Sequence, residues 1–312
     1  MSQTTAPTTQ STILMIRPVS FGFNEQTAES NAFQQKNQDQ HQVQHQALME
    51  FNAFVDVLQA NGVHVVVIND TVEPHKPDAI FPNNWVSFHE NGDVIMYPMQ
   101  AENRRLERRE DVIRQLENEF KVNHIIDLSR FELENKFLEG TGSMVLDRDN
   151  KIAYACLSPR TSTEVLEVFC RQTGYTAVSF HAVDQNKMAI YHTNVLMCIA
   201  SKYAVICLQS IADETEQKNV TDSLTKTGKT IIEITFDQMN QFAGNMLELT
   251  SKEGESLLVM SKRAYHSLTK EQRHQLEHFS KIIYADLEAI ENNGGGSARC
   301  MMAEVRLPRQ QD

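Results

Sequence analysis

A helix-like segment followed directly by a short β-branched run occurs five times along the 312-residue chain. The runs start roughly every 50 to 60 residues and cover residues 63–68, 122–128, 176–180, 230–234 and 281–285. Apolar residues recur at helical spacing in the segments before them, residues 47–60, 107–120, 162–172, 214–226 and 269–279. Glycine follows three of these helices, as Gly62, Gly174 and Gly228, where it can form a left-handed cap. The pattern therefore predicts five αβ units.

Each unit also holds further strand-like runs, at residues 13–16, 94–97, 152–156, 195–199 with 204–208, and 257–260. The units fill the chain and no Pro/Ser-rich linker interrupts them, which leaves no room for a second domain. We therefore expect a single α/β domain over residues 11–312, a cyclic propeller of five αβ modules whose loops converge on an axial site. The polar residues 1–10 are expected to form a disordered lead-in.

An ordinary open α/β sheet remains the alternative, because periodicity alone does not distinguish it from a cyclic array. A dinucleotide-binding form of that sheet is disfavoured. Residues 140–145 (GTGSMV) lack the third glycine of the dinucleotide-binding motif and lead into a strand-like run.

Composition excludes several classes of function. The formal charge of −12 argues against nucleic acid or an anionic membrane surface as the main partner. No uncharged apolar run approaches the roughly 18 residues of a membrane helix, and the N-terminus MSQTTAPTTQ does not resemble a signal peptide. Five cysteines, an odd number, favour reduced thiols in the cytoplasm. The sequence does not decide the oligomeric state, and a homo-oligomer is one outcome.

One cysteine differs from the other four in its surroundings. Cys156, Cys170, Cys198 and Cys207 lie in apolar strand or helix patterns and are expected to be inert core residues. Cys300 follows the stretch NNGGGSAR, where three glycines give a flexible, side-chain-free approach to a thiolate nucleophile. Arg299 could add positive charge there. A buried thiol in a loop that leads to a final strand at 301–306 is an equally good interpretation of the spacing.

Histidine is the usual partner of a nucleophilic cysteine. His192 opens the apolar run at 195–199, and a polar residue at a strand mouth suits a loop-lined site, although a satisfied core histidine fits as well. The pairs His41 with His45 and His274 with His278 have i,i+4 spacing but lack the Glu of a zincin motif. We expect solvated helix faces there, and no metal site.

Two acidic segments complete the candidates. Glu139, in FLEGTG, lies between apolar residues and a tight turn, where a carboxylate needs a cationic or hydrogen-bonding partner. Asp78 begins DAIFPNNW, which holds the only tryptophan and two adjacent asparagines. A proline turn with Asx capping would also explain this second segment.

Together these motifs resemble the pentein superfamily, which contains arginine deiminases, dimethylarginine hydrolases and amidinotransferases. Residues 294–301 (GGGSARCM) resemble its nucleophile loop Gly-Gly-x-x-Arg-Cys-Met, and Leu138-Glu139-Gly140 resembles its Glu-Gly-Gly segment, with Thr141 in place of the second glycine. His192 takes the place of the catalytic histidine. The resemblance extends from Asp78 to Met301 and implies a five-bladed αβ propeller, in agreement with the fivefold pattern.

The same resemblance implies substrate-binding arginines. Residues 157–162 (LSPRTS) are similar to the Leu-Ser-x-Arg-Thr-Asn segment of dimethylarginine hydrolases, whose arginine binds the substrate α-carboxylate, so Arg160 is the candidate here. Asn103-Arg104-Arg105 resembles another of their substrate-arginine segments and makes Arg104 the second candidate.

Two departures from the family pattern concern charge. Dimethylarginine hydrolases have Asp-x-Val-Phe-x-x-Asp, where this chain keeps Asp78 but has Asn84 in place of the second acid. Arginine deiminases have His-x-Asp, where this chain has His192-Thr193-Asn194. A buried cation without its counter-charges is unfavourable by several kcal/mol, whereas a neutral ureido group suits asparagines that donate and accept. This favours citrulline over arginine.

A second resemblance leads to the same substrate. FPNNW, LEGTG, HTNV and residues 242–248 (FAGNMLE) look like the bacterial citrulline-utilisation hydrolases, a branch of the superfamily. Asn245, in the last of these, is expected to be a polar core residue rather than an amide of the site wall, because apolar residues surround it.

These features lead to one main prediction. We expect a hydrolase of the L-citrulline ureido bond that forms ornithine, ammonia and carbon dioxide without metal or organic cofactor. Its nucleophile is Cys300, its acid and base is His192, and Glu139 orients His192. Asp78, Asn84 and Asn194 contact the ureido head, and Arg160 with Arg104 binds the α-carboxylate. The alternatives are an arginine deiminase or dimethylarginine hydrolase, and a non-catalytic binding protein on the same fold.

Overall fold

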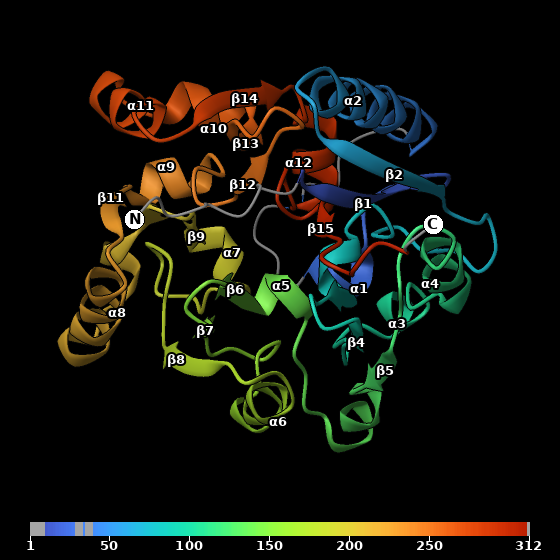
Figure 1. The fold of residues 1–312 in the computed structure, drawn as a ribbon, viewed down its shortest axis with the longest axis horizontal. Coiled ribbons are helices and arrows are strands. Elements are labelled where there is room, and N and C mark those ends of the chain that lie inside the picture. The colour runs from blue at the N-terminus through green and yellow to red at the C-terminus, as the bar shows by residue number, and fades with distance from the viewer. Residues whose placement is uncertain (1–9, 29–33, 35–39, 311–312) are drawn as a thin grey trace, which may run out of the picture.

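Five small sheets form a ring around a common axis (Figure 1). The computed structural model describes residues 10–28, 34 and 40–310. In each sheet the middle strand pairs antiparallel with an inner strand and parallel with an outer strand. The sheets, inner strand first, are β15 (Ala303–Glu304), β1 (Thr12–Arg17), β2 (His64–Asn69); β3 (Val86–Phe88), β4 (Asp93–Met96), β5 (His124–Asp127); β6 (Met144–Asp147), β7 (Ile152–Cys156), β8 (Thr176–Phe180); β9 (Met197–Ile199), β10 (Tyr203–Ile206), β11 (Thr230–Glu233); and β12 (Leu247–Thr250), β13 (Ser256–Ser261), β14 (Lys281–Ala285).

A helix precedes every outer strand and lies at the periphery of the ring (Figure 1). The five are α2 (Gln40–Ala60), α4 (Glu110–Leu116), α6 (Thr163–Thr173), α8 (Glu214–Lys226) and α11 (Lys270–Glu277). Their apolar faces are buried against the sheets, which places four hydrophobic clusters between the peripheral helices and the strands. Gly62, Gly174 and Gly228 all have φ near +75° after their helices, as the predicted caps require.

The predicted fivefold α/β propeller is therefore confirmed, and the open-sheet alternative is wrong. The expected outer strands at 176–180 and 281–285 match β8 and β14 residue for residue. The ring is closed by β15, from the end of the chain, which pairs with β1 near its start. The expected disordered lead-in falls almost entirely on residues 1–9, which lie outside the described residues, while Gln10 donates to the Gly62 carbonyl at 2.8 Å.

Shorter helices and helical turns lie between these elements along the chain. They are α1 (Glu25–Ala28), α3 (Glu102–Arg105), α5 (Gly140–Ser143), α7 (Thr193–Leu196), α9 (Phe236–Asn240), α10 (Lys262–Ser267), α12 (Glu288–Gly294), η1 (Pro82–Asn84), η2 (Ser129–Glu134) and η3 (Leu208–Ser210). One expectation is wrong here: the strand predicted at 195–199 begins only at Met197, because α7 intervenes after His192. Periodicity does not distinguish one apolar helical turn from the start of a buried strand.

A polar residue near the axis lies two to five positions before the start of each inner strand. Asn84 precedes β3 by two residues, Glu139 precedes β6 by five, His192 precedes β9 by five, Asn245 precedes β12 by two and Cys300 precedes β15 by three. Because the inner strands surround the axis, the residues before them meet at one end of it. The fold itself therefore assembles the site.

Candidate active site

The segment that carries Cys300 is a helix end followed by a tight turn. Helix α12 ends at Gly294, and Gly295 caps it in the left-handed region with φ 64°. A Cβ on Gly294 or Gly296 would lie 2.8 Å from the Phe81 ring, so these two positions accept no larger residue without displacement of that ring. The glycines thus allow the nucleophile loop to pack directly against Phe81. Cys300 at its end is buried, with 7% of its surface exposed.

Two asparagine amides donate to the sulfur of Cys300. Asn245 Nδ2 lies 3.3 Å and Asn194 Nδ2 lies 3.5 Å from Sγ. The Asn245 amide has only one consistent orientation, because its Oδ1 accepts from the Arg299 backbone N–H at 3.0 Å. N–H donors at this distance stabilise negative charge on sulfur. Asn245 is buried, as expected of a polar core residue, but the sequence gave no indication that its amide contacts the candidate nucleophile.

His192 and Glu139 form the closest polar pair of the site. His192 Nε2 lies 2.8 Å from Glu139 Oε2, and the carboxyl group has no exposed surface. Burial lowers the pKa of His192 to about 4 although Glu139 opposes this shift. Burial alone would raise the pKa of Glu139, but Arg160 and the hydrogen bond from His192 hold that pKa well below its usual range. Near neutral pH a neutral His192 therefore donates from Nε2 to a carboxylate, and Nδ1 is left as an acceptor.

A second group of charged residues surrounds Arg104. Its guanidinium donates to both oxygens of Glu107, from Nε at 2.8 Å and from an Nη at 2.9 Å. It also donates to Asn84 Oδ1 at 3.0 Å and lies 3.8 Å from Asp78. Arg104 is thus held bidentately by Glu107 within the wall of the site.

Burial shapes the titration of the two acids beside Arg104. Burial raises the pKa of Glu107 to about 7 even though Arg104 lowers it. The pKa of Asp78 is raised by burial as well, because Arg104 and a hydrogen bond from Asn24 only partly offset the desolvation. For Arg104 the balance is reversed: burial would lower its pKa, and the charges of Glu107 and Asp78 raise it. Desolvation thus dominates at both acids and the ion pairs dominate at the guanidinium.

Arg160 is the second guanidinium near the Glu139 carboxylate. Its Nη1 is 3.6 Å from Glu139 Oε2, its Nη2 donates to the Thr27 carbonyl at 3.3 Å, and its guanidinium stacks 4.8 Å above the Tyr191 ring. The Tyr191 hydroxyl in turn donates to the Gly295 carbonyl at 3.1 Å. Tyr191 therefore connects Arg160 to the glycine turn.

The predicted residues meet around one small cavity. Its lining includes Cys300, His192, Asp78, Asn84, Arg104 and Arg160, together with Thr27, Phe81, Tyr191 and residues 294–296. Glu139 and Asn194 do not line the cavity themselves: Glu139 is hydrogen-bonded to His192, and Asn194 donates to the sulfur of Cys300. The volume is about 20 Å³, which is room for about one water molecule.

Gly142 makes the arrangement possible. A Cβ there would lie 2.3 Å from Asn84 Nδ2 and 2.9 Å from His192 Nδ1. Only a residue without a side chain lets this amide and this imidazole face the cavity together.

One residue of the site gave no signal in the sequence. Asn24 is buried and donates from Nδ2 to Asp78 Oδ2 at 2.7 Å, and Phe21 packs edge-on against Phe81 with ring centroids 6.5 Å apart. A single asparagine in a Phe-Gly-Phe-Asn turn has no spacing or motif that marks it. Asn245 precedes an inner strand, as Asn84, Glu139 and His192 do, but this equivalence is visible only once the strands are paired.

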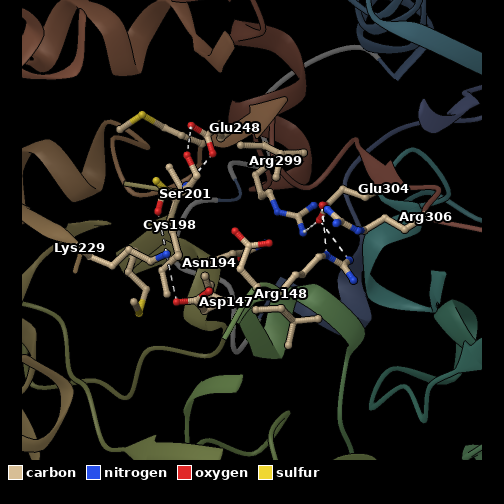
Figure 2. Close-up of a pocket in the computed structure, with 18 residues that line it drawn as sticks. Asp147, Arg148, Asn194, Cys198, Ser201, Lys229, Glu248, Arg299, Glu304 and Arg306 are labelled. Atoms are coloured by element: carbon tan, nitrogen blue, oxygen red, sulfur yellow. Dashed lines mark hydrogen bonds and ion pairs between the residues drawn. The ribbon is translucent and has the colours of Figure 1, made fainter. Parts of the chain in front are cut away.

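Arg299 points away from the nucleophile that it precedes. Figure 2 shows its side chain in a second cavity, of about 100 Å³, which is lined by the inner strands β6, β9, β12 and β15. There Arg299 and Arg148 share the carboxylate of Glu304, at 3.3 Å and 3.2 Å. Its guanidinium therefore does not supply the positive charge near Cys300 that the sequence suggested.

The remaining candidates lie elsewhere. His41, His45, His274 and His278 are exposed, as expected of solvated helix faces. Over the described ranges, no cluster of His, Cys, Asp or Glu side chains could hold a metal ion. Cys156, Cys198 and Cys207 are buried as predicted, whereas Cys170 is only half-buried. Among the same residues, no helix combines the length and apolarity needed to cross a membrane.

A ring of five αβ units with cysteine, histidine and glutamate at its axis defines the pentein superfamily of guanidino-modifying enzymes. Within it, residues 17–307 match the family model described as N,N dimethylarginine dimethylhydrolase, eukaryotic. The chain belongs to this family. Among curated proteins, none matches the sequence.

Solved structures agree on the fold. The N-terminal domain of ArgZ, described as an arginine dihydrolase from the ornithine–ammonia cycle in Cyanobacteria, matches with a TM-score of 0.75 and 17% identity, over 96% of this chain and 99% of that one. Unliganded AgrE matches with a TM-score of 0.76 and 17% identity, over 97% of this chain and 40% of that longer one. A dimethylarginine dimethylaminohydrolase adduct with S-methyl-L-thiocitrulline gives 0.61 and 14%, over 95% and 100%.

Proposed function

We propose that the chain is a cysteine-dependent hydrolase that cleaves the ureido carbon–nitrogen bond of L-citrulline and releases ornithine, ammonia and carbon dioxide. The reaction would take place in the cytoplasm, where thiols stay reduced. The substrate is a small amino acid, and the scheme requires no cofactor.

The orientation of the Asn84 amide is the observation that favours citrulline. Its Oδ1 accepts from Arg104, which is always a donor, so Nδ2 is the end of the amide that is turned away from Arg104, and Asn84 is one of the residues that line the cavity. One N–H of Nδ2 is directed at the Glu139 carbonyl, at 3.4 Å, and we assign the other to the ligand. A ureido group carries a carbonyl oxygen that can accept from this donor. A guanidinium has only donors, so one of its N–H groups would face the N–H of Asn84 and no hydrogen bond could form.

Two further groups fit the rest of the molecule. Asp78 Oδ1 is buried and has no hydrogen-bond partner among the described residues, so it can accept from a substrate N–H. Arg160, stacked on Tyr191, is the guanidinium that we assign to the α-carboxylate. Arg104 is committed to Glu107, so we assign it to the support of Asn84 and Asp78.

The geometry suggests the order of proton transfers. Nδ1 of neutral His192 takes the proton of the Cys300 thiol, and the sulfur attacks the ureido carbon while the Asn194 and Asn245 amides stabilise its charge. His192 then protonates the departing ornithine nitrogen, which leaves a carbamoyl group on sulfur. Water gives a proton to His192 and attacks the carbamoyl carbon, and the thiol recovers that proton. The released carbamic acid breaks down to ammonia and carbon dioxide.

The second candidate is a hydrolase of a cationic substrate, arginine or methylated arginine. Three carboxyl groups in the wall, those of Asp78, Glu107 and Glu139, face two guanidiniums, those of Arg104 and Arg160. When all three are ionised, the excess negative charge would attract a guanidinium. Since the pKa of Glu107 is raised to about 7 by burial, one proton on this group removes the excess and suits a neutral ligand.

A direct assay of the purified protein separates these candidates. Citrulline, arginine and Nω-methylated arginines are offered in turn, and ornithine, citrulline and ammonia are quantified, with the Cys300→Ala variant as the blank. We expect ornithine and ammonia from citrulline alone. Formation of citrulline from arginine would refute the proposal, and no turnover of any substrate would favour a binding protein.

The isosteric variant Asn84→Asp tests the argument from the amide. It replaces the donor that faces the cavity by an acceptor, so kcat/KM for citrulline should fall on the order of 100-fold, while arginine should gain relative to citrulline. An unchanged preference would show that Asn84 does not select the substrate.

A further inference from the structure

A buried carboxyl group outside the site contacts the nucleophile loop. Glu291 lies in α12 with 1% of its surface exposed, and its Oε1 accepts from Ser297 Oγ at 2.6 Å. No step of the proposed reaction uses this group. Burial of a carboxyl group costs free energy unless the group is hydrogen-bonded or paired with a cation.

Ser297 is also hydrogen-bonded to the backbone of the candidate nucleophile. Its carbonyl accepts from the backbone N–H of Cys300 at 3.0 Å and of Met301 at 3.3 Å. Ser297 is also the first residue after three glycines that has a side chain to hold the loop. One end of Ser297 is therefore fixed to α12, and the other fixes the turn that carries the sulfur.

Several groups surround the Glu291 carboxyl. Arg263 Nη1 lies 3.9 Å from Oε2, and the neighbouring acid is Glu50, which accepts from the backbone N–H groups of Ala289 and Ile290 at the start of α12. Burial raises the pKa of Glu291 to about 7, although hydrogen bonds from Ser297 and Ser261 and the charge of Arg263 lower it. Both protonation states are populated near neutral pH, and each keeps an oxygen that can accept from Ser297. A glutamine has the same shape as the protonated form.

We propose that Glu291 is a positioning residue, which through Ser297 sets the distance between the end of α12 and the sulfur of Cys300. The proposal rests on Cys300 as the nucleophile but not on the choice of substrate. A shift of the loop would move the sulfur relative to Asn194, Asn245 and the reacting carbon. It would leave Asp78 and Arg104 in place, because Asn24 and Glu107 hold them. The expected signature is a fall in kcat that is larger than any change in KM.

The test compares Glu291→Ala with Glu291→Gln. Alanine removes the acceptor, and kcat should fall on the order of 10- to 100-fold, since displacement of a reacting atom by about 1 Å has effects of this size. Glutamine keeps an acceptor oxygen and should restore most of kcat. Ser297→Ala should lower kcat as much as Glu291→Ala. The double variant should be no worse than either single variant, because both substitutions remove the same hydrogen bond.

Glu50→Ala is the matched control: Glu50 lies in α2 but contacts the start of the same helix, α12. It removes the hydrogen bonds at the start of α12 and should lower Tm, but it leaves the contact between Glu291 and Ser297, so kcat should stay near that of the unaltered chain. An equal loss of kcat in Glu50→Ala, or wild-type kcat in Glu291→Ala, would overturn the proposal.

A second readout does not depend on the substrate. The rate at which 2-chloroacetamide alkylates Cys300, followed by mass spectrometry of its peptide, should fall in Glu291→Ala and recover in Glu291→Gln. If the unaltered chain shows no citrulline turnover but this pattern holds, the proposed function fails and the positioning role stands. If turnover occurs and the alkylation rate is the same in all variants, the positioning role fails alone.

Discussion

The two walls of the cavity hold their functional groups in different ways. The charged wall, made of Asp78, Arg104, Glu107, Glu139 and Arg160, is built from buried ion pairs between 2.8 and 4.0 Å. The amide wall, made of Asn194, Asn245 and the loop 294–300, presents neutral N–H donors to the sulfur. Each wall suits the group that the proposed function places beside it: ionic charge on a zwitterionic substrate, and transient charge on a thiolate.

The difference suggests that stability and reaction rate should depend on different residues. Buried ions are costly singly and tolerable in pairs, so the charged wall must be intact for the fold to be stable. Neutral amides pay a smaller desolvation penalty, so their loss should affect the reaction more than the fold. Predictions that break one wall at a time test this contrast.

The largest effect is expected from Arg104→Met in the charged wall. It leaves Asp78, Glu107 and Glu139 with Arg160 as the remaining guanidinium, and the free energy of unfolding should fall by about 3–5 kcal/mol at neutral pH. The loss should shrink below pH 7, because Glu107, whose pKa burial raises to about 7, then takes a proton. Urea unfolding at several pH values measures both effects.

The paired variant Arg104→Met with Glu107→Leu is the control. It removes both charges of the closest pair, and part of the stability should return. Wild-type stability of Arg104→Met alone would show that the acids of this wall are already protonated, and the contrast between the walls would lose its basis.

The next effect concerns the amide wall. Asn245→Asp keeps the acceptor for the Arg299 N–H but places an oxygen instead of an N–H against the sulfur. We expect kcat for citrulline to fall on the order of 10²- to 10³-fold, as for loss of a donor to a developing negative charge. KM should change little, because Arg160 and Asp78 are untouched. Tm should fall, because the new carboxylate is buried without a cation and replaces the amide that donates to the Asn194 carbonyl at 2.9 Å.

Steady-state kinetics and the alkylation rate of Cys300 check this second prediction together. Asn245→Gln, which keeps the amide but lengthens the side chain, is the control for packing. If Asn245→Asp turned over citrulline at the wild-type rate, the sulfur would need no amide donors, and His192 would account for its activation.

The sequence was sufficient to predict the ring and most of the site. Helical spacing and the cap glycines Gly62, Gly174 and Gly228 depend on local chemistry, so the five units could be placed correctly. The role of Asn245 could not be inferred from its apolar neighbours, because it is set by Cys300, 55 positions later in the chain. Its position before an inner strand is shared with Asn84, Glu139 and His192, and this equivalence is visible only once the strands are paired.

Distances across the ring explain the other differences. The sequence suggested Arg104 for the substrate carboxylate, but it gave no sign that Glu107, three residues away, occupies the guanidinium. Arg299 precedes the nucleophile, yet its side chain is directed to Glu304 on the other side of the loop. Spacing predicts which residues meet at the axis, whereas the direction of each side chain depends on its partners.

The smallest effect is expected where the walls meet, at His192. Burial lowers its pKa to about 4 from an ordinary 6.5, so between these pH values His192 is neutral in the native state and protonated in the unfolded chain. The stability that His192 contributes is therefore present above pH 6.5 and is lost as the pH falls towards 4. Between pH 8 and pH 5 this amounts to about 2 kcal/mol for one group.

His192→Gln removes the titration but keeps a side-chain N–H that can donate to Glu139. The free energy of unfolding of this variant should fall less between pH 8 and pH 5 than that of the unaltered chain, by about 2 kcal/mol. Glu107 works in the opposite direction over the same range, since its native pKa is raised to about 7 and its stability contribution grows as the pH falls. Because Glu107 is present in both proteins, the difference between the two pH profiles isolates His192. Parallel profiles would mean that the pKa of His192 is not lowered in the native state. If the unaltered chain instead gained stability relative to the variant as the pH falls, the native state would hold an imidazolium beside the Glu139 carboxylate, and the first proton transfer would have to start from a thiolate.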